Sequence, residues 1–220
     1  MRPAPLRQTA IKICGISTLP ALDAVVAARA DYAGFVFFPK SPRHVTLEQA
    51  AALGTAAQGR ISRVGLFVDA DDATLAEAVA AAKLDVLQLH GEESPTRAAQ
   101  LRARFGLPVW KALPVAKAED VARAEAYRGA VNLVLFDAKT PKGTLPGGMG
   151  LAFDWSLVAG FKAGGFPAGW GLAGGINPAN VAEAIARTGT PLVDCSSGVE
   201  SAPGVKDAEK IAAFCAAVRT

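Results

Sequence analysis

Cysteine and histidine are both rare in this sequence. The three cysteines, Cys14, Cys195 and Cys215, are an odd number at wide spacings without a CxxC pair, which argues against a disulfide framework and a cysteine-based metal site. The two histidines, His44 and His90, fall in different parts of the chain, and no metal-ligand spacing is present. We therefore expect that the protein binds no metal, so that any activity it has survives a strong chelator. We also expect it to reside in a reducing compartment.

Long apolar runs are absent as well. No stretch of about 18 apolar residues is available to cross a bilayer, so no membrane partner is expected. The first ten residues include Arg2, Pro3, Pro5 and Arg7 and lack the apolar core of a signal peptide. Both observations favour a cytoplasmic location.

Charge of one sign is not in large excess. The 23 Lys and Arg residues against 20 Asp and Glu residues give a net charge of +3, and the isoelectric point is about 8.8. Nucleic-acid binders usually carry a clustered basic stripe and a pI above roughly 9, whereas the positive charges here are scattered among acidic ones. We expect no nucleic-acid partner, and the weak positive balance is compatible with a small anionic metabolite.

What the sequence does have is a regular alternation of short β-rich runs with alanine-rich helical runs. The β-rich runs number eight: Ile11–Gly15, Tyr32–Phe38, Val64–Asp69, Val86–His90, Val109–Leu113, Leu133–Asp137, Trp170–Gly174 and Leu192–Ser196. The helical runs have apolar residues at helical spacing: Leu19–Arg29, Leu47–Ala57, Thr74–Ala82, Pro95–Phe105, Glu119–Tyr127, Trp155–Ala163, Ala179–Arg187 and Ala208–Arg219. Such alternation predicts βαβ units and a parallel sheet.

Eight such units predict an α/β fold of the (β/α)8 TIM-barrel type. Residues 1–220 are expected to form a single domain, with residues 1–10 as a short N-terminal extension, because no linker or composition shift divides the chain. An open doubly wound sheet is the alternative, but the segment Cys14-Gly15-Ile16-Ser17 after the first strand lacks the GxGxxG fingerprint. The long connection 138–153 is where such a barrel would place a lid.

Polar residues recur at the carboxyl ends of the predicted strands, where barrel enzymes have their active sites. Because strand side chains alternate between the barrel interior and the helix layer, residues two apart share a face. The polar residues are Lys12 and Cys14 on the first strand, Gln88 and His90 on the fourth, Asp137 at the end of the sixth, and Asp194 on the eighth. We expect these side chains to converge on one mouth of the barrel.

Each of these candidates also has a purely structural interpretation. Cys14 by itself fits a small buried hydrophobe, but its place at a strand end before a glycine favours a reactive thiol. Asp137 can cap a loop or helix, and His90 can be a hydrogen-bonded structural residue. Cys195 has helix-facing parity and Cys215 lies in the last helix, so both are expected in the core.

Two further segments have the chemistry to bind anions. Arg43 lies in the proline-flanked loop 39–44, where it is either a solvated charge or a fork for a carboxylate. Gly174 and Gly175 open a helix after the seventh strand, and Ser196-Ser197-Gly198 follows the eighth. Glycines let the backbone approach a ligand, helix N-termini present free N–H groups, and loops seven and eight often bind phosphate in barrels.

Taken together, these motifs resemble those of the phosphoribosylanthranilate isomerase family of tryptophan biosynthesis. The resemblance covers nearly the whole chain after residue 10. It rests on these segments: Lys12-Ile13-Cys14-Gly15-Ile16; Gly34-Phe35-Val36-Phe37 with Lys40-Ser41-Pro42-Arg43; Val64-Gly65-Leu66-Phe67-Val68; Gln88-Leu89-His90-Gly91; Phe136-Asp137; Gly147-Gly148-Met149-Gly150 with Phe153-Asp154-Trp155; Leu172-Ala173-Gly174-Gly175-Ile176; and Asp194-Cys195-Ser196-Ser197-Gly198-Val199-Glu200. Met149 departs from the Thr or Ser that the family more often has there.

The resemblance implies an isomerase that converts N-(5-phosphoribosyl)anthranilate to 1-(2-carboxyphenylamino)-1-deoxy-D-ribulose 5-phosphate by an Amadori rearrangement without a cofactor. It implies Cys14 as general base, Asp137 as general acid and Arg43 as the ligand of the anthranilate carboxylate. The phosphate would bind the backbone of Gly174, Gly175 and the segment Ser196-Ser197-Gly198. Lys12, on the same face as Cys14, is expected to help electrostatically. The implied partner is a small phosphorylated substrate, and the protein would be a monomer or a homodimer.

Three other functions remain as alternatives. A different isomerase or lyase can use the same barrel, although the motifs of indole-glycerol-phosphate synthase are absent. A catalytically silent phosphate-binding barrel would keep the glycine and serine loops without needing Cys14 and Asp137. A bifunctional sugar isomerase that also serves histidine biosynthesis would favour a pair of aspartates, and Cys14 argues against it.

Overall fold

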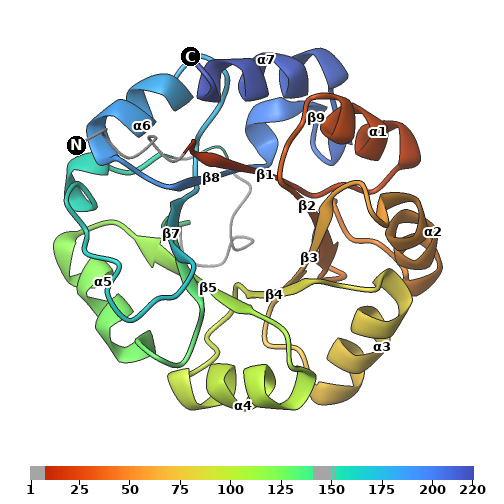
Figure 1. Ribbon diagram of the computed structural model, residues 1–220, viewed down its shortest axis with the longest axis horizontal. Helices are drawn as coiled ribbons and strands as arrows, with labels where there is room; N and C mark the ends of the chain where they lie inside the picture. Colours follow the sequence, from red (N-terminus) through yellow and green to blue (C-terminus); the bar gives the residue numbers. More distant parts are fainter. Residues whose placement is uncertain (1–7, 141–149, 151) are drawn as a thin grey trace, which may run out of the picture.

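The architecture is a closed parallel barrel, seen in a computed structural model that describes residues 8–140, 150 and 152–220. Strands β1 to β8 pair in sequence order, and β8 pairs with β1. Figure 1 shows them as a ring surrounded by helices. The strands are Ala10–Cys14, Tyr32–Phe37, Ser62–Phe67, Val86–Leu89, Val109–Val115, Leu133–Ala138, Gly169–Leu172 and Leu192–Cys195. The predicted (β/α)8 fold is confirmed.

Several of the helices outside the barrel begin where side-chain oxygens cap them. Thr46, Asp71, Ser94 and Asp207 each accept a hydrogen bond from a backbone N–H in the first turn of the following helix, which satisfies donors that have no partner within the helix. The α-helices α1 to α7 are Leu19–Ala27, Leu47–Ala57, Asp72–Ala82, Pro95–Phe105, Ala118–Ala122, Val181–Thr188 and Ala208–Val218. Among the described residues, no helix is long and apolar enough to span a bilayer.

Two predicted helices are wrong in extent. In place of the helix Trp155–Ala163, the structure has the single 3-10 turn η2, Trp155–Leu157, and Gly160 then takes a positive φ of 78°. Glycine is a poor helix former, and the left-handed conformation ends a helix. The predicted helix Glu119–Tyr127 is divided into the short α5 and the 3-10 helix η1, Arg123–Tyr127.

The apolar residues form two layers. The larger cluster fills the space between the barrel and the helices, and it includes the buried Cys195 and Cys215, as expected. Inside the barrel, one cluster is built from Val64, Val86, Trp110, Ala112, Leu133, Leu135 and Leu192, and a smaller one from Cys14, Val36 and Leu66. The barrel interior is therefore packed with side chains, as in other TIM barrels.

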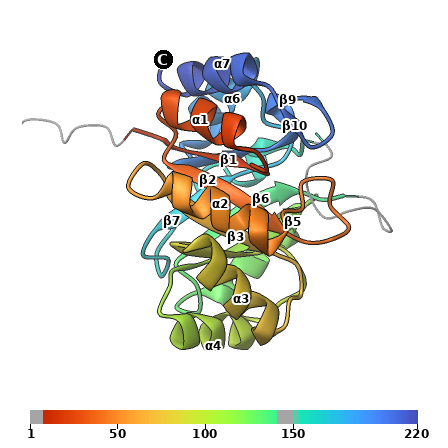
Figure 2. The same cartoon turned by 90° about the vertical axis from the view of Figure 1, so that its right-hand side faces the viewer.

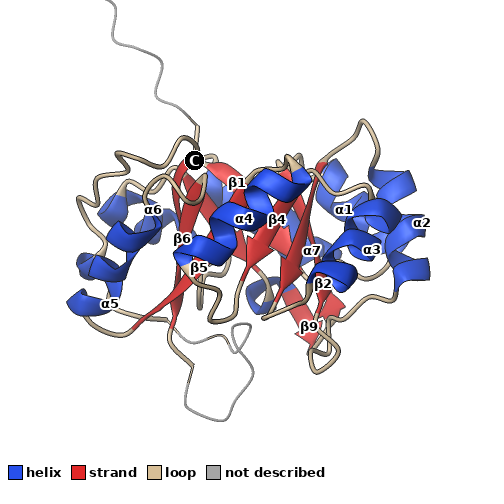
Figure 3. Cartoon of the chain, turned by 90° about the horizontal axis from the view of Figure 1, so that it is seen from below, coloured by secondary structure: helices blue, strands red, loops and turns tan. Residues whose placement is uncertain are grey.

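An additional hairpin follows β8 and was not predicted. The 3-10 helix η3, Ser197–Val199, leads into it. The hairpin itself is formed by the antiparallel strands β9, Glu200–Ala202, and β10, Val205–Lys206. The hairpin projects from the barrel on the side of the strand carboxyl ends, opposite the chain's C-terminus (Figures 2 and 3). The expected extension 1–10 contributes Ala10 to β1. The first seven residues, Met149 and most of the expected lid loop lie outside the described residues.

Candidate active site

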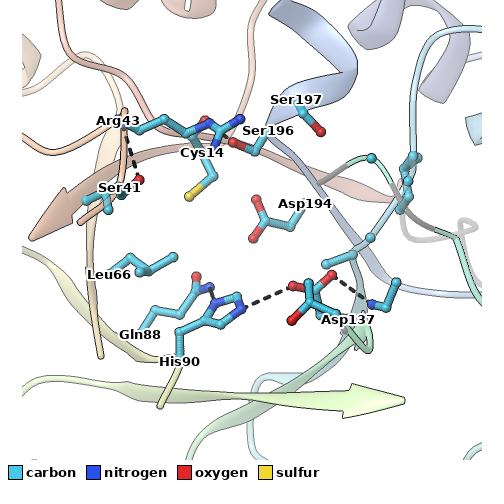
Figure 4. A pocket seen from close by; sticks show the side chains of 18 of the residues that line it. Cys14, Ser41, Arg43, Leu66, Gln88, His90, Asp137, Asp194, Ser196 and Ser197 are labelled. Atoms are coloured by element: carbon cyan, nitrogen blue, oxygen red, sulfur yellow. Dashed lines mark hydrogen bonds and ion pairs between the residues drawn. The ribbon is translucent and has the colours of Figure 1, made fainter. Parts of the chain in front are cut away.

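A pocket at the carboxyl ends of the strands brings most of the predicted site residues together. Its lining includes Cys14 from β1, Arg43 from the loop after β2, His90 after β4, Asp137 from β6, and Asp194 from β8. Figure 4 shows the Cys14 sulfur and the Asp137 carboxyl pointing into this pocket from opposite sides. Of the six polar residues expected to converge here, all but the fully buried Lys12 line the pocket.

Cys14 lies beside two buried charged side chains. Lys12 is fully buried on the same face of β1, and its Nζ donates a hydrogen bond of 2.7 Å to Asp194 Oδ2 on β8. Lys12 and Asp194 are direct register partners, so strand pairing itself brings them together. Gly34, the register partner of Cys14, leaves room for them: a Cβ on it would lie 3.0 Å from Cys14 Sγ and 3.2 Å from Lys12 Cε.

The charges around Cys14 have opposing effects on its acidity. Burial raises the pKa of the Cys14 thiol, while the Lys12 ammonium opposes this shift. Burial would lower the pKa of Lys12, but the neighbouring Asp194 carboxylate and Cys14 outweigh it, and the pKa of Lys12 is raised. Lys12 is therefore a cation placed to stabilise a thiolate at Cys14.

Asp137 is oriented by two contacts. Its Oδ1 accepts a hydrogen bond of 2.8 Å from the backbone N–H of Ala138, and its Oδ2 lies 3.1 Å from His90 Nε2. His90 Nδ1 is in turn 3.4 Å from Gln88 Nε2 (Figure 4). Asp137 thus faces the pocket and His90, and no helix begins on it.

Arg43 is buried beside the pocket, so the alternative of a solvated charge is wrong. Its Nε donates to Glu200 Oε1 at 2.7 Å and its Nη2 to Glu200 Oε2 at 2.8 Å. The predicted carboxylate fork is therefore occupied along one edge by a carboxylate of the chain itself. In the sequence, Glu200 stands out only as the last residue of the segment 194–200, and nothing in its position indicates that it would pair with a residue 157 positions away.

The glycine and serine loops meet at the pocket. Gly174 and Gly175, which line it, have φ values of 78° and 65°, a region that favours glycine. A Cβ on Gly174 would also lie 2.7 Å from Asp137 Oδ1. Ser196 and Ser197 line the pocket, whereas Gly198 packs against the carbonyl of Ile176, where a Cβ would clash.

Two buried acceptors in the pocket have no hydrogen-bond partner in the described part of the chain: Asp194 Oδ1 and Gln88 Oε1. An unpaired buried acceptor costs roughly 1–3 kcal/mol, and both residues line the pocket. Donors on a ligand would satisfy them. In the described ranges, no cluster of three or more His, Cys, Asp or Glu side chains is arranged to hold a metal ion.

A closed (β/α)8 barrel whose strand ends surround a thiol, a carboxyl and a buried arginine defines a TIM-barrel enzyme with acid–base chemistry. Residues 11–217 match the family described as N-(5'phosphoribosyl)anthranilate (PRA) isomerase. The chain belongs to this family.

Individual relatives agree over almost their whole lengths. The chain is 53% identical to the N-(5'-phosphoribosyl)anthranilate isomerase of Paramagnetospirillum magneticum, covering 95% of this chain and 96% of the relative, and 52% identical to that of Rhodospirillum rubrum, covering 97% and 99%. The crystal structure of phosphoribosyl anthranilate isomerase from Thermotoga maritima superposes with a TM-score of 0.83 at 36% identity, covering 94% and 96%. A second structure of such an isomerase is in complex with reduced 1-(o-carboxyphenylamino)-1-deoxyribulose 5-phosphate. It superposes with a TM-score of 0.81 at 34% identity, covering 94% of this chain and 96% of that one.

Proposed function

We propose that this protein isomerises N-(5-phosphoribosyl)anthranilate to 1-(2-carboxyphenylamino)-1-deoxy-D-ribulose 5-phosphate, with Cys14 as general base and Asp137 as general acid. The observation that carries the proposal is that these two side chains face one pocket from opposite sides, in a chain of this family. Acid–base catalysis requires that both groups reach one substrate, and a sugar bound in this pocket would lie between them.

The reaction needs two proton transfers at different atoms. As the anthranilate nitrogen lone pair forms the C=N bond and the ribose C–O bond breaks, Asp137 delivers its proton to the ring oxygen. The protonated Schiff base acidifies the C2′ hydrogen, and the Cys14 thiolate removes it to give an enolamine. Protonation at C1′ and loss of the enol proton yield the ketone, so no atoms or electrons are gained or lost.

The remaining lining residues suit the two ends of this substrate. Arg43 would contact the anthranilate carboxylate, and the loops of Gly174, Gly175, Ser196 and Ser197 would present backbone N–H groups to the phosphate. Gly198 would support these loops from behind, through its contact with Ile176. The unpaired Asp194 Oδ1 would accept a hydrogen bond from the substrate.

The cellular location and the oligomeric state are also part of the proposal. A substrate of this kind is small, anionic and water-soluble, so the protein would act in the cytoplasm on a free metabolite. The same-family structure described as monomers of the dimeric Thermotoga maritima enzyme keeps both a monomer and a homodimer as candidate states for this chain.

The decisive experiment is a turnover assay on N-(5-phosphoribosyl)anthranilate. Its fluorescence should decay faster when the purified protein is added, and the product should be the 1-deoxyribulose phosphate. The assay is repeated after treatment with EDTA, and an unchanged rate is expected. Binding of inorganic phosphate without any turnover would instead support a silent phosphate-binding barrel.

A further inference from the structure

Three ionic side chains beside the pocket form one buried network. Glu200, at the start of β9, accepts hydrogen bonds through Oε1 from both Arg43 Nε and Lys206 Nζ, each at 2.7 Å. Its Oε2 accepts from Arg43 Nη2 at 2.8 Å and from the backbone N–H of Gly204 at 3.2 Å. The side chains of Glu200 and Lys206 are only 4% and 1% exposed. The hairpin β9–β10 therefore places a carboxylate and an ammonium directly behind the pocket wall.

The backbone at two glycines shows how closely Arg43 and its loop are held. Gly15 has a φ of 81°, and a Cβ on it would lie 2.6 Å from Arg43 Cδ, so the arginine stem runs directly across β1's end. Gly204, in the hairpin turn, has a φ of 82°, and a Cβ there would lie 2.6 Å from the carbonyl oxygen of Pro42. The Arg43 side chain is thus held against the end of β1, and its loop is held against the hairpin.

The other end of the network reaches the serine loop. Lys206 Nζ donates to the carbonyl oxygen of Ser196 at 2.9 Å, and it lies 3.4 Å from Ser196 Oγ. Ser196 Oγ donates to the carbonyl oxygen of Cys14 at 3.1 Å. Through Lys206, Glu200 thereby connects Arg43 to the Ser196 loop, and both Arg43 and Ser196 line the pocket.

Such a network is an expensive way to gain stability. Burial would raise the pKa of Glu200, but Arg43 and Lys206 outweigh it and hold this pKa below its usual value. Burial lowers the pKa of Lys206, although Glu200 opposes the shift. Buried ion pairs often gain little over apolar packing because both partners lose hydration. The network is therefore better explained by the orientation that it gives to Arg43 and to the Ser196 loop than by added stability.

We propose that Glu200 and Lys206 are positioning residues: Glu200 orients Arg43 toward the substrate carboxylate, and Lys206 holds the Ser196 loop in place for the phosphate. The inference rests on the proposed function, because it assigns each end of that substrate to one arm of the network. Among the described residues, no hydrogen bond joins Glu200 or Lys206 to Cys14 or Asp137, so substrate binding should depend on them more than the chemical step does.

The test uses anthranilate and inorganic phosphate as separate competitive inhibitors of the full-length enzyme. Glu200→Gln should weaken inhibition by anthranilate about tenfold and inhibition by phosphate less than threefold, because it disturbs the Arg43 arm. Lys206→Met should show the reverse preference. Both variants should raise KM while kcat changes less than threefold. Glu183→Gln is the matched control, since its ion pair with Arg187 is exposed on α6, and it should leave all values unchanged.

A double-mutant cycle separates orientation from general destabilisation. If Glu200 acts through Arg43, Glu200→Gln should add little to the KM increase already caused by Arg43→Ala. Equal weakening of both inhibitors in both variants, or fully additive effects in the double mutant, would overturn the proposal. Should Glu200→Gln fail to fold, the inhibitor preference of Lys206→Met decides alone. A wild-type protein without turnover would refute the proposed function itself, which is a different result.

Discussion

His90 Nε2 lies 3.1 Å from Asp137 Oδ2, inside a pocket where both side chains are largely buried. A contact of this kind fixes the direction of the carboxyl group within the pocket. Replacing His90 by Asn would remove it. We expect kcat to fall about tenfold with little change in KM, since a hydrogen bond to a charged group is worth about 1.5–3 kcal/mol. If steady-state kinetics show an unchanged kcat and only the melting temperature falls, His90 is purely structural.

Cys14 and Asp137 carry the sharpest prediction. General acids and bases typically contribute about 10²–10⁴-fold each, so Cys14→Ser and Asp137→Asn should each lower kcat by at least roughly a hundredfold. Both variants should still bind a product analogue. Cys215→Ser is the control, since Cys215 is buried in the outer core away from the pocket. Near-normal turnover of Cys14→Ser would return Cys14 to the status of a core residue.

Arg43 should govern substrate affinity. Arg43→Ala is expected to raise KM about tenfold or more, because a charge-assisted contact with the carboxylate is lost. Arg43→Lys should recover only part of this loss, since lysine cannot reproduce the planar fork that also pairs with Glu200. Michaelis kinetics of the two variants provide the check, and wild-type KM in Arg43→Ala would remove Arg43 from the site.

Gly175 tests the phosphate loop. Gly175→Val should weaken competitive inhibition by inorganic phosphate and raise KM, because a β-branched residue strains a φ of 65° and distorts the loop. Gly106 has the same φ at the end of α4 with open space around it, so Gly106→Val imposes similar strain away from the pocket. Phosphate inhibition should weaken only in the first variant. Equal inhibition constants in the two variants would refute the assignment.

The reactivity of Cys14 should depend on pH in a defined direction. Because burial raises the pKa of Cys14, less thiolate is present at neutral pH than for a free cysteine of pKa about 8.5. The rate of alkylation at Cys14 should therefore keep rising above pH 8.5, and a product analogue should slow it. Alkylation is measured by mass spectrometry at Cys14. A plateau at or below pH 8.5 would show that Lys12 outweighs burial.

Much of the fold was predictable from local signals. The eight strand positions follow from β-rich runs between alanine-rich segments, and each observed barrel strand overlaps a predicted one. The errors are local: Trp155–Ala163 has apolar spacing but also a glycine that adopts a left-handed conformation. The hairpin β9–β10 was missed because strands of three and two residues are too short to show a period of two.

The barrel, the family resemblance and the set of polar residues at the strand ends could all be predicted from local patterns, because strand parity and chain order are local properties. Which of these residues touch one another depends on the tertiary structure. Lys12 meets Asp194 across 182 positions, and Arg43 meets Glu200 across 157, because barrel closure and the final hairpin bring distant segments together. Contacts of this kind depend on the register of β1 against β8 and on the packing of two loops. No periodicity along the chain encodes either of them.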